Sequence, residues 1–284
     1  NGLAISAFAR AAQATSDARY LDAAQRAATF VLERVVKDGR LHRRYRAGEI
    51  AIPAFLEDHA FVVEGLLDLY EADFDPRWLR EARELMRRAI ELFEDRERGG
   101  FFSTPPSHDS RISRRKELYD GAVPSGNAVA YANLLRLHRI TGDDVLGAAI
   151  ERFESLAGSL LRDDPTSHPQ LLAAVELRLA RPVEIVVLGA REDADTGALI
   201  DAIRKRFHPA KVVLFAESAE SAKELTTLSP LFEAKIAIDG KATAYVCRDR
   251  VCKLPARDVD TLRKQLNEAQ SEARKNADAA DAGE

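Results

Sequence analysis

Residues 114–127 read RRKELYDGAVPSGN and connect a charged loop to the beginning of an apolar helix. The two glycines of this stretch permit close backbone approach, and Pro124 suits a first helical turn, where no backbone N–H is needed. Ser125 and Asn127 place small polar groups beside the free amides of the helix N-terminus. The stretch therefore predicts either a site for a polyhydroxylated or anionic ligand or an elaborate helix cap.

The composition is that of a globular protein. The chain has 284 residues, of which 46% are hydrophobic and 31% charged, so it can bury one or two cores. Its net charge of −4 lacks the basic excess of general nucleic-acid binders, and we expect no nucleic-acid partner. No apolar run approaches the roughly 18 residues that cross a membrane. No signal-like start is visible, so we expect a cytoplasmic protein without a membrane partner. Because the chain opens at Asn1 inside an apolar helix pattern, we expect it to begin within a longer protein.

The first two thirds of the chain show one helical pattern after another. The expected helices cover residues 3–11, 17–35, 57–70, 76–93, 124–140, 144–160 and 166–179, with an irregular loop or short hairpin at 40–54. The first, third and fifth helices are apolar around most of their circumference, whereas the second, fourth and sixth are amphipathic and charged. An inner and an outer ring of antiparallel helix hairpins require this alternation. The sequence predicts a mainly α fold, a partial toroid of antiparallel helix hairpins followed by a small α/β region.

The period of the hydrophobic pattern changes after Pro182. Strands at 183–189 and 211–215 flank a helix at 194–207, which predicts a βαβ unit. Residues 234–238 and 243–246 flank Asp239-Gly240, a hairpin signal. A charged helix at 258–273 and a disordered tail at 276–284 complete the pattern. We expect three regions: helical hairpins at 1–182, a small α/β region at 183–262, and a charged helix end with a tail at 263–284.

Two carboxylates are candidates for acid/base chemistry, Asp58 and Asp120. Asp58 follows Glu57 at a helix start, and adjacent helical residues point about 100° apart. Helix capping is the competing interpretation, and it fits Glu57 better than Asp58. His59 is better explained as a structural group than as a proton shuttle.

The remaining candidates are ligand-binding groups. Arginine and lysine bind anionic or hydroxyl groups, and tyrosine stacks on a sugar face. The candidate substrate-binding residues are Tyr45, Glu57, Arg114, Lys116, Tyr119, Ser125 and Asn127. Solvated loop side chains are the competing interpretation for the arginines.

The sequence indicates no cofactor or metal. Cys247 and Cys252 are too far apart in sequence for a zinc or redox pair, and no further ligands lie nearby. We expect two buried structural thiols in a reducing compartment, although a turn between them would allow a bridge. The turn after residues 183–189 lacks a glycine-rich phosphate loop, so a nucleotide-binding role is the weakest hypothesis.

Five motifs together resemble a known family, the thioredoxin-domain-containing proteins of the spermatogenesis-associated type. They are NGLAISA at 1–7, LEDHAF at 56–61, GGFF at 99–102, R-x-KE-x-x-DGA-x-PSGN at 114–127, and AYVC-x4-C-x-x-P at 244–255. The resemblance implies an N-terminal thioredoxin-like domain joined to an (α/α)6 barrel similar to N-acylglucosamine 2-epimerases and six-hairpin glycosidases. This chain lacks that domain, its C-x-x-C motif and the early barrel hairpins, and we expect these missing parts as its partners.

Two functions follow from these observations. The first is a carbohydrate-related barrel portion that binds a sugar-like ligand, with isomerase, epimerase or glycosidase-like chemistry at a central pocket. The alternative is a non-catalytic scaffold that presents a thioredoxin-like domain in redox or protein-quality functions.

Overall fold

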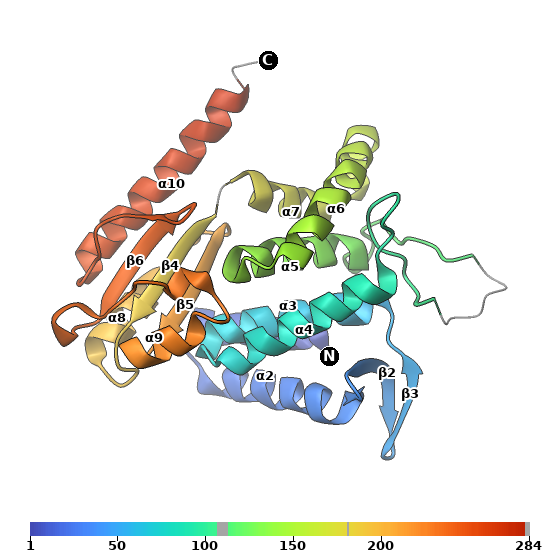
Figure 1. The fold of residues 1–284 in the computed structure, drawn as a ribbon, viewed down its shortest axis with the longest axis horizontal. Coiled ribbons are helices and arrows are strands. Elements are labelled where there is room, and N and C mark those ends of the chain that lie inside the picture. Colours follow the sequence, from blue (N-terminus) through green and yellow to red (C-terminus); the bar gives the residue numbers. More distant parts are fainter. Residues whose placement is uncertain (107–112, 181, 282–284) are drawn as a thin grey trace. The chain divides into compact units, whose positions relative to one another are not determined.

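The computed structural model describes residues 1–106, 113–180 and 182–281, with side chains up to Ser271 (Figure 1). The chain divides into two compact units: unit 1 comprises residues 1–138 and 143–175, and unit 2 comprises residues 139–142 and 176–284. The described residues form ten α-helices and two small sheets, which confirms the mainly α class. The toroid and the region boundary at residue 182 stay predictions.

Seven helices belong mainly to unit 1. They are α1 (Gly2–Thr15), α2 (Ala18–Phe30), α3 (Leu56–Asp73), α4 (Pro76–Phe93), α5 (Gly126–Thr141), α6 (Asp144–Asp163) and α7 (Pro169–Leu179). Aspartates cap three of them: Asp17, Asp75 and Asp143 each accept a hydrogen bond from the backbone N–H two residues later. A π-helical turn, Val31–Val35, continues α2.

The predicted alternation of helix types is visible in the burial of α3 and α4, but not in α1, where Leu3 and Phe8 are each 38% exposed. Helix α3 is buried over most of its circumference, whereas α4 buries a narrow stripe that includes Trp78, Leu79 and Phe93. Helices α1 and α3 meet at their backbones, since a Cβ added to Gly65 would lie 2.8 Å from the carbonyl oxygen of Gly2. Residues 36–53 form a three-stranded antiparallel sheet of β1 (Val36–Lys37), β2 (Arg40–Arg46) and β3 (Glu49–Pro53), so 40–54 contains a hairpin.

Unit 2 is built on a four-stranded sheet. Its elements are β4 (Val183–Leu188), α8 (Ala194–Arg204), β5 (Lys211–Ala216), α9 (Ala219–Leu225), β6 (Thr243–Arg248), β7 (Val251–Cys252) and α10 (Val259–Asp281). The strand order is β5-β4-β6-β7, with β4 and β5 parallel and β4 and β6 antiparallel. The predicted βαβ unit is confirmed.

Two predictions for unit 2 are wrong. Residues 234–238 form no strand: Asp239 lies in a 3-10 turn at Ile238–Gly240, and β6 pairs with β4 and β7 instead. The tail is helical up to Asp281, because its alanines favour helix. The predicted disorder at 282–284 falls outside the described residues.

Candidate functional site

A cavity of about 460 Å³ lies in unit 1 at the N-termini of α3 and α5. Segments 55–57 and 121–126 form much of its lining, together with Arg43, Ser103, Glu117 and Tyr119. Of the predicted binding residues, Glu57, Tyr119 and Ser125 lie in this lining. The predicted helix mouth therefore borders a cavity, and its role as a ligand site stays a prediction.

Arg43 organises the polar side of the cavity. Its guanidinium forms an ion pair with the carboxylate of Glu57 and lies 4.5 Å from the ring centroid of Phe55. Both charged side chains keep more than a third of their surface exposed. The ring of Tyr119 is also accessible, since this residue is 58% exposed. A guanidinium, a carboxylate and an aromatic face are groups that bind hydroxyl-bearing ligands.

Asp58 caps the N-terminus of helix α3. Its Oδ2 accepts a hydrogen bond of 2.9 Å from the backbone N–H of Phe55, the N-cap residue of α3. The capping role therefore falls to Asp58 and not to Glu57, contrary to the sequence-based interpretation. Burial raises the pKa of Asp58, against the opposing effects of the Phe55 hydrogen bond and Arg43. Asp58 does not line the cavity.

Asp120 joins two helix N-termini. Its Oδ1 accepts a 2.7 Å hydrogen bond from the backbone N–H of Ser125, before α5. Its Oδ2 accepts a 2.8 Å bond from the backbone N–H of Gln170, in the first turn of α7. Each carboxylate oxygen thus provides a hydrogen-bond acceptor for a backbone N–H that has no partner within its own helix. The carboxylate is not part of the cavity lining.

Asn127 is 1% exposed and forms three hydrogen bonds. Its Oδ1 accepts from the N–H of Phe101 at 2.7 Å, while its Nδ2 donates to the carbonyl of Phe101 at 2.9 Å. Nδ2 also donates to the carbonyl of Glu117 at 2.8 Å. The hydroxyl of Ser125 accepts from the N–H of Ala128 at 3.2 Å. These side chains fasten the preceding loop to the start of α5.

The side chains of Arg114 and Lys116, both predicted to bind a ligand, instead hold the loop that precedes α5. Arg114 donates to the carbonyls of Thr104 and Leu92, at 2.8 and 2.9 Å, and lies over the ring of Phe102. Lys116 lies 2.8 Å from the Asp95 carboxylate, which lowers the pKa of that carboxyl. Neither cation lines the cavity.

Tyr45 and His59 lie outside the lining as well. Tyr45, on β2, packs edge-on against Phe30 with 5.3 Å between ring centroids. The Nδ1 of His59 lies 3.1 Å from the carbonyl oxygen of Phe55, and the residue is 1% exposed. Burial lowers the pKa of His59 to about 4, so the imidazole is neutral at pH 7. This environment agrees with a structural histidine.

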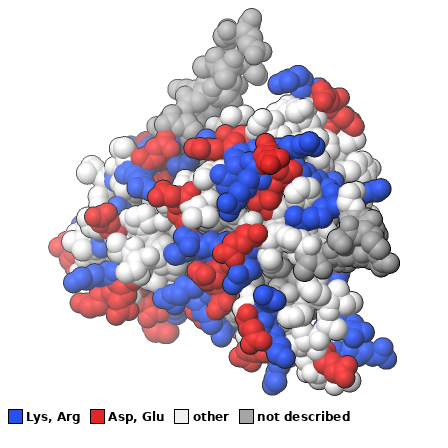
Figure 2. Space-filling view, turned by 45° about the vertical axis from the view of Figure 1, so that its right-hand side comes forward, with Lys and Arg blue, Asp and Glu red and all other residues white. Residues whose placement is uncertain are grey.

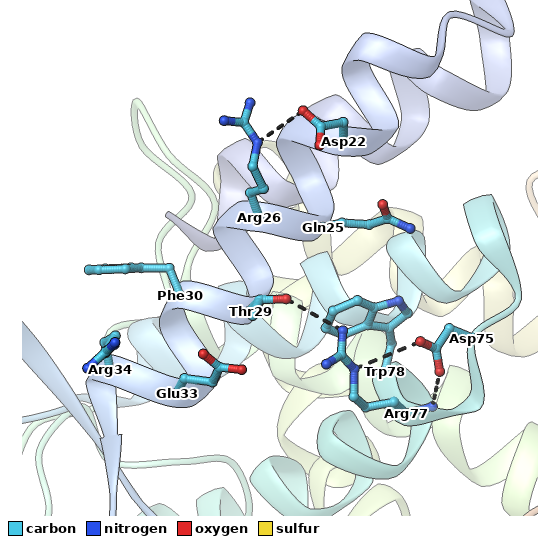
Figure 3. A pocket seen from close by; sticks show the side chains of 10 residues that line it. All are labelled: Asp22, Gln25, Arg26, Thr29, Phe30, Glu33, Arg34, Asp75, Arg77 and Trp78. Atoms are coloured by element: carbon cyan, nitrogen blue, oxygen red, sulfur yellow. Dashed lines mark hydrogen bonds and ion pairs between the residues drawn. The ribbon is translucent and has the colours of Figure 1, made fainter.

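A second cavity of about 530 Å³ runs along α2 and α4 (Figure 3). Arg26 pairs there with Asp22 at 3.0 Å, and Arg77 lies 4.0 Å from the ring centroid of Trp78. The sequence did not predict this groove. Its lining residues are mostly charged or polar, and such residues on the outer face of a helix are usually solvated. Figure 2 shows basic and acidic side chains interspersed over the visible face, in agreement with the small net charge.

No described helix has the length and hydropathy to cross a bilayer. Among the side chains up to Ser271 that the structure describes, no group of three or more His, Cys, Asp and Glu residues is placed to hold a metal ion.

The fold defines a mainly α protein, in which one unit is built of helix hairpins and the other is a small α/β unit. No family model matches the chain. It is similar to spermatogenesis-associated protein 20 of Homo sapiens, at 33% identity over 279 residues, and of Rattus norvegicus, at 33% over 283 residues. An uncharacterized Caenorhabditis elegans protein is 26% identical over 274 residues.

Each of these alignments covers 94% of this chain. The chain spans about a third of the length of these relatives: 35% of the two mammalian proteins and 37% of the nematode protein. The similarity supports the spermatogenesis-associated type that the five motifs indicate.

Proposed function

We propose that this chain is a helical scaffold portion of a thioredoxin-domain-containing protein of the spermatogenesis-associated type. The homologues named spermatogenesis-associated protein 20 fit such a scaffold. One observation carries the proposal: each oxygen of the Asp120 carboxylate accepts a hydrogen bond from a backbone N–H at the N-terminus of a different helix. A carboxylate bound in this way acts as a helix cap, because both of its oxygens are held by backbone N–H groups.

The other residues of the 114–127 motif support the same function. Arg114 and Asn127 bond backbone groups of the neighbouring loop, and Lys116 pairs with Asp95. A scaffold needs its loops held in one conformation, since an ordered surface is what it presents to a partner domain. The partner domain in this proposal is a thioredoxin-like domain, with redox or protein-quality functions for the assembly.

The experiment compares Asp120→Ala with Asp120→Asn in the whole chain. Asp120→Ala loses both caps, worth about 1 kcal/mol each, so we expect its Tm to fall by about 4–8 °C. Asp120→Asn keeps one carbonyl acceptor and should lie between the wild type and Asp120→Ala. The control is Asp22→Ala, whose exposed ion pair with Arg26 should leave the Tm within about 1 °C. An unchanged Tm in Asp120→Ala would refute the capping role that the scaffold requires.

A second function, binding of a sugar-like ligand, is favoured by the cavity at α3 and α5. Its lining combines the exposed ring of Tyr119 with the Arg43–Glu57 pair and the Ser125 segment. Within this proposal, isomerase, epimerase or glycosidase-like chemistry requires an acid and a base. Asp58 and Asp120 stay predictions for these roles, and their hydrogen bonds favour capping.

A thermal-shift series with neutral sugars, amino sugars and sugar phosphates tests this second function. We expect one class to raise the Tm, since a ligand that binds only the folded state stabilises it. Tyr119→Ala should abolish that shift, and Tyr20→Ala, on α2, is the matched control. If no ligand shifts the Tm, the sugar proposal fails while the scaffold proposal stands.

A further inference from the structure

Cys247 and Cys252 form a disulfide across the β6–β7 hairpin, with an S–S distance of 2.09 Å. The expectation of two separate thiols is therefore wrong. The cysteines face each other in the strand register, because the turn at Asp249-Arg250 returns the chain directly. The two residues differ in exposure: Cys247 is 4% exposed, whereas Cys252 is only partly buried.

The surroundings of Cys252 leave it open to a reactant. Strand β7 is the last strand in the order β5-β4-β6-β7, so Cys252 lies at a sheet edge. Its neighbours in sequence include Val251 and Leu254, which are 75% and 85% exposed. We propose that Cys247–Cys252 is a reversible thiol–disulfide exchange site, which takes a small thiolate of the glutathione class at the sulfur of Cys252.

The exchange is balanced with that thiol as the only co-reactant. The incoming thiolate attacks Sγ of Cys252, the Cys247–Cys252 bond breaks, and Cys247 leaves as a thiolate. A second thiolate attacks the small-molecule sulfur of the mixed disulfide and releases Cys252. The protein gains two electrons and two protons, and two thiols leave as one oxidised disulfide. Oxidation is the reverse, with the small-molecule disulfide as the oxidant.

The turn between the two cysteines contacts the buried carboxylate of Glu184. Asp249 and Arg250 have φ values of +48° and +65°, in the left-handed region that disfavours residues other than glycine. In this conformation the N–H of Arg250 donates to Oε2 of Glu184 at 3.1 Å. Glu184 is 1% exposed, and its Oε1 accepts from Arg139 at 3.1 Å. The disulfide thus closes a hairpin whose tip supplies one of the donors of a buried carboxylate.

Reduction leaves most of the hairpin in place. The N–H of Lys253 donates to the carbonyl of Val246, and Ala244 and Ala256 exchange two backbone hydrogen bonds, so neither contact depends on the disulfide for its donor or acceptor. Only the tip loses its covalent closure, so the left-handed turn can relax and withdraw the Arg250 N–H from Glu184. Exchange at this site is therefore compatible with a folded unit 2.

The test places the whole chain in buffers of graded reduced-to-oxidised glutathione ratio, followed by alkylation and mass measurement. We expect a reversible change from no alkylated cysteine to two, under conditions in which circular dichroism shows a folded protein. Hydrogen exchange at the Arg250 amide should become about tenfold faster in the reduced form, while that of Ala244 stays constant. If alkylation occurs only after denaturation, the disulfide is structural and the proposal is overturned.

Two single variants test which sulfur reacts. Cys247→Ser leaves the accessible Cys252, and we expect it to form a mixed disulfide with oxidised glutathione. Cys252→Ser leaves the buried Cys247, and we expect at least about tenfold slower adduct formation. Equal rates, or faster reaction at Cys247, would refute the assignment of Cys252. Circular dichroism of both variants confirms that each is folded before the rates are compared.

Discussion

Asp68 and Arg136 form a buried ion pair between α3 and α5, with 2.8 Å between Oδ1 and Nη1. Their side chains are 5% and 16% exposed. Burial raises the pKa of Asp68, but Arg136 and Arg10 outweigh that effect and hold it below its usual value. The hydroxyl of Ser6 also donates to Asp68, at 2.6 Å. One carboxylate therefore connects α1, α3 and α5.

Removal of one partner of this pair should destabilise unit 1 strongly. Arg136→Met leaves the Asp68 charge buried without its main counter-ion, and we expect a loss of about 3–5 kcal/mol in the free energy of unfolding. Chemical denaturation measures the loss. Arg88→Met breaks an exposed pair with Glu91 on α4, so this control should lose less than about 1 kcal/mol. Equal effects of the two substitutions would contradict the buried network.

Gly65→Ala should destabilise the chain although alanine favours helix. A Cβ at this position meets the backbone oxygen of Gly2 at 2.8 Å and Cβ of Ile5 at 3.0 Å, so α1 and α3 must separate. We expect a loss of about 1–3 kcal/mol, as in other overpacked cores. Gly158→Ala on α6 is the matched control, because a Cβ there meets nothing within 4 Å. Gly158→Ala should raise the free energy of unfolding by about 0.5–1 kcal/mol. Denaturation midpoints of the two variants measure both changes.

Asn127→Ala should loosen the loop before α5. The substitution leaves the N–H and carbonyl of Phe101 and the carbonyl of Glu117 without their side-chain partner. An unsatisfied buried polar group costs about 1–3 kcal/mol, so we expect a loss at the upper end of that range or above it. Hydrogen exchange at Phe101 gives a local readout. Unchanged protection of its amide would show that the loop is held elsewhere.

Stability should fall as the pH drops from 6.5 towards 4. His59 is buried as the neutral imidazole with its pKa lowered to about 4, whereas an unfolded histidine has a pKa near 6.5. The unfolded state therefore binds more protons in this window, and protonation favours unfolding as the pH falls. The histidine contributes a loss of about 3 kcal/mol between pH 7 and pH 4.

His59→Gln tests this pH dependence. The variant should show a smaller stability difference between pH 7 and pH 4 than the wild type. His208, buried with a pKa that is also lowered to about 4, should retain part of the dependence. His42→Gln is the control, since the hydrogen bond of His42 to Arg40 is exposed. A His59→Gln profile parallel to that of the wild type would contradict this explanation.

Local signals predicted the helices well. The Asp75-Pro76 pair correctly predicted the start of α4, and the stripe of apolar residues along this helix correctly predicted its end at Phe93. Features that depend on distant partners were not predictable. Asp239-Gly240 does form a turn, but β6 takes its long partner from β4, more than fifty residues earlier. A turn signal cannot report which strand is the neighbour.

The same distinction applies to the candidate site. The stretch at 114–127 predicted a helix mouth, and a cavity lies there. The roles within it depend on contacts across the fold: one partner of Asp120 is Gln170, fifty residues later. The disulfide depended on a left-handed turn at two residues that rarely adopt one. Charge and hydrogen-bonding capacity were readable from the sequence, but the partners were not.

The side-chain amide of Asn127 pairs with Phe101 as a neighbouring strand would, accepting from its N–H and donating to its carbonyl. Aspartate lacks the donor, and glutamine is one methylene longer. The Pro-Ser-Gly-Asn tetrapeptide at 124–127 is thus a signature of a loop-to-helix junction. We expect a protein in which this tetrapeptide begins a helix to share the junction, whatever reaction that protein catalyses, so the tetrapeptide is a guide to architecture and not to enzyme class.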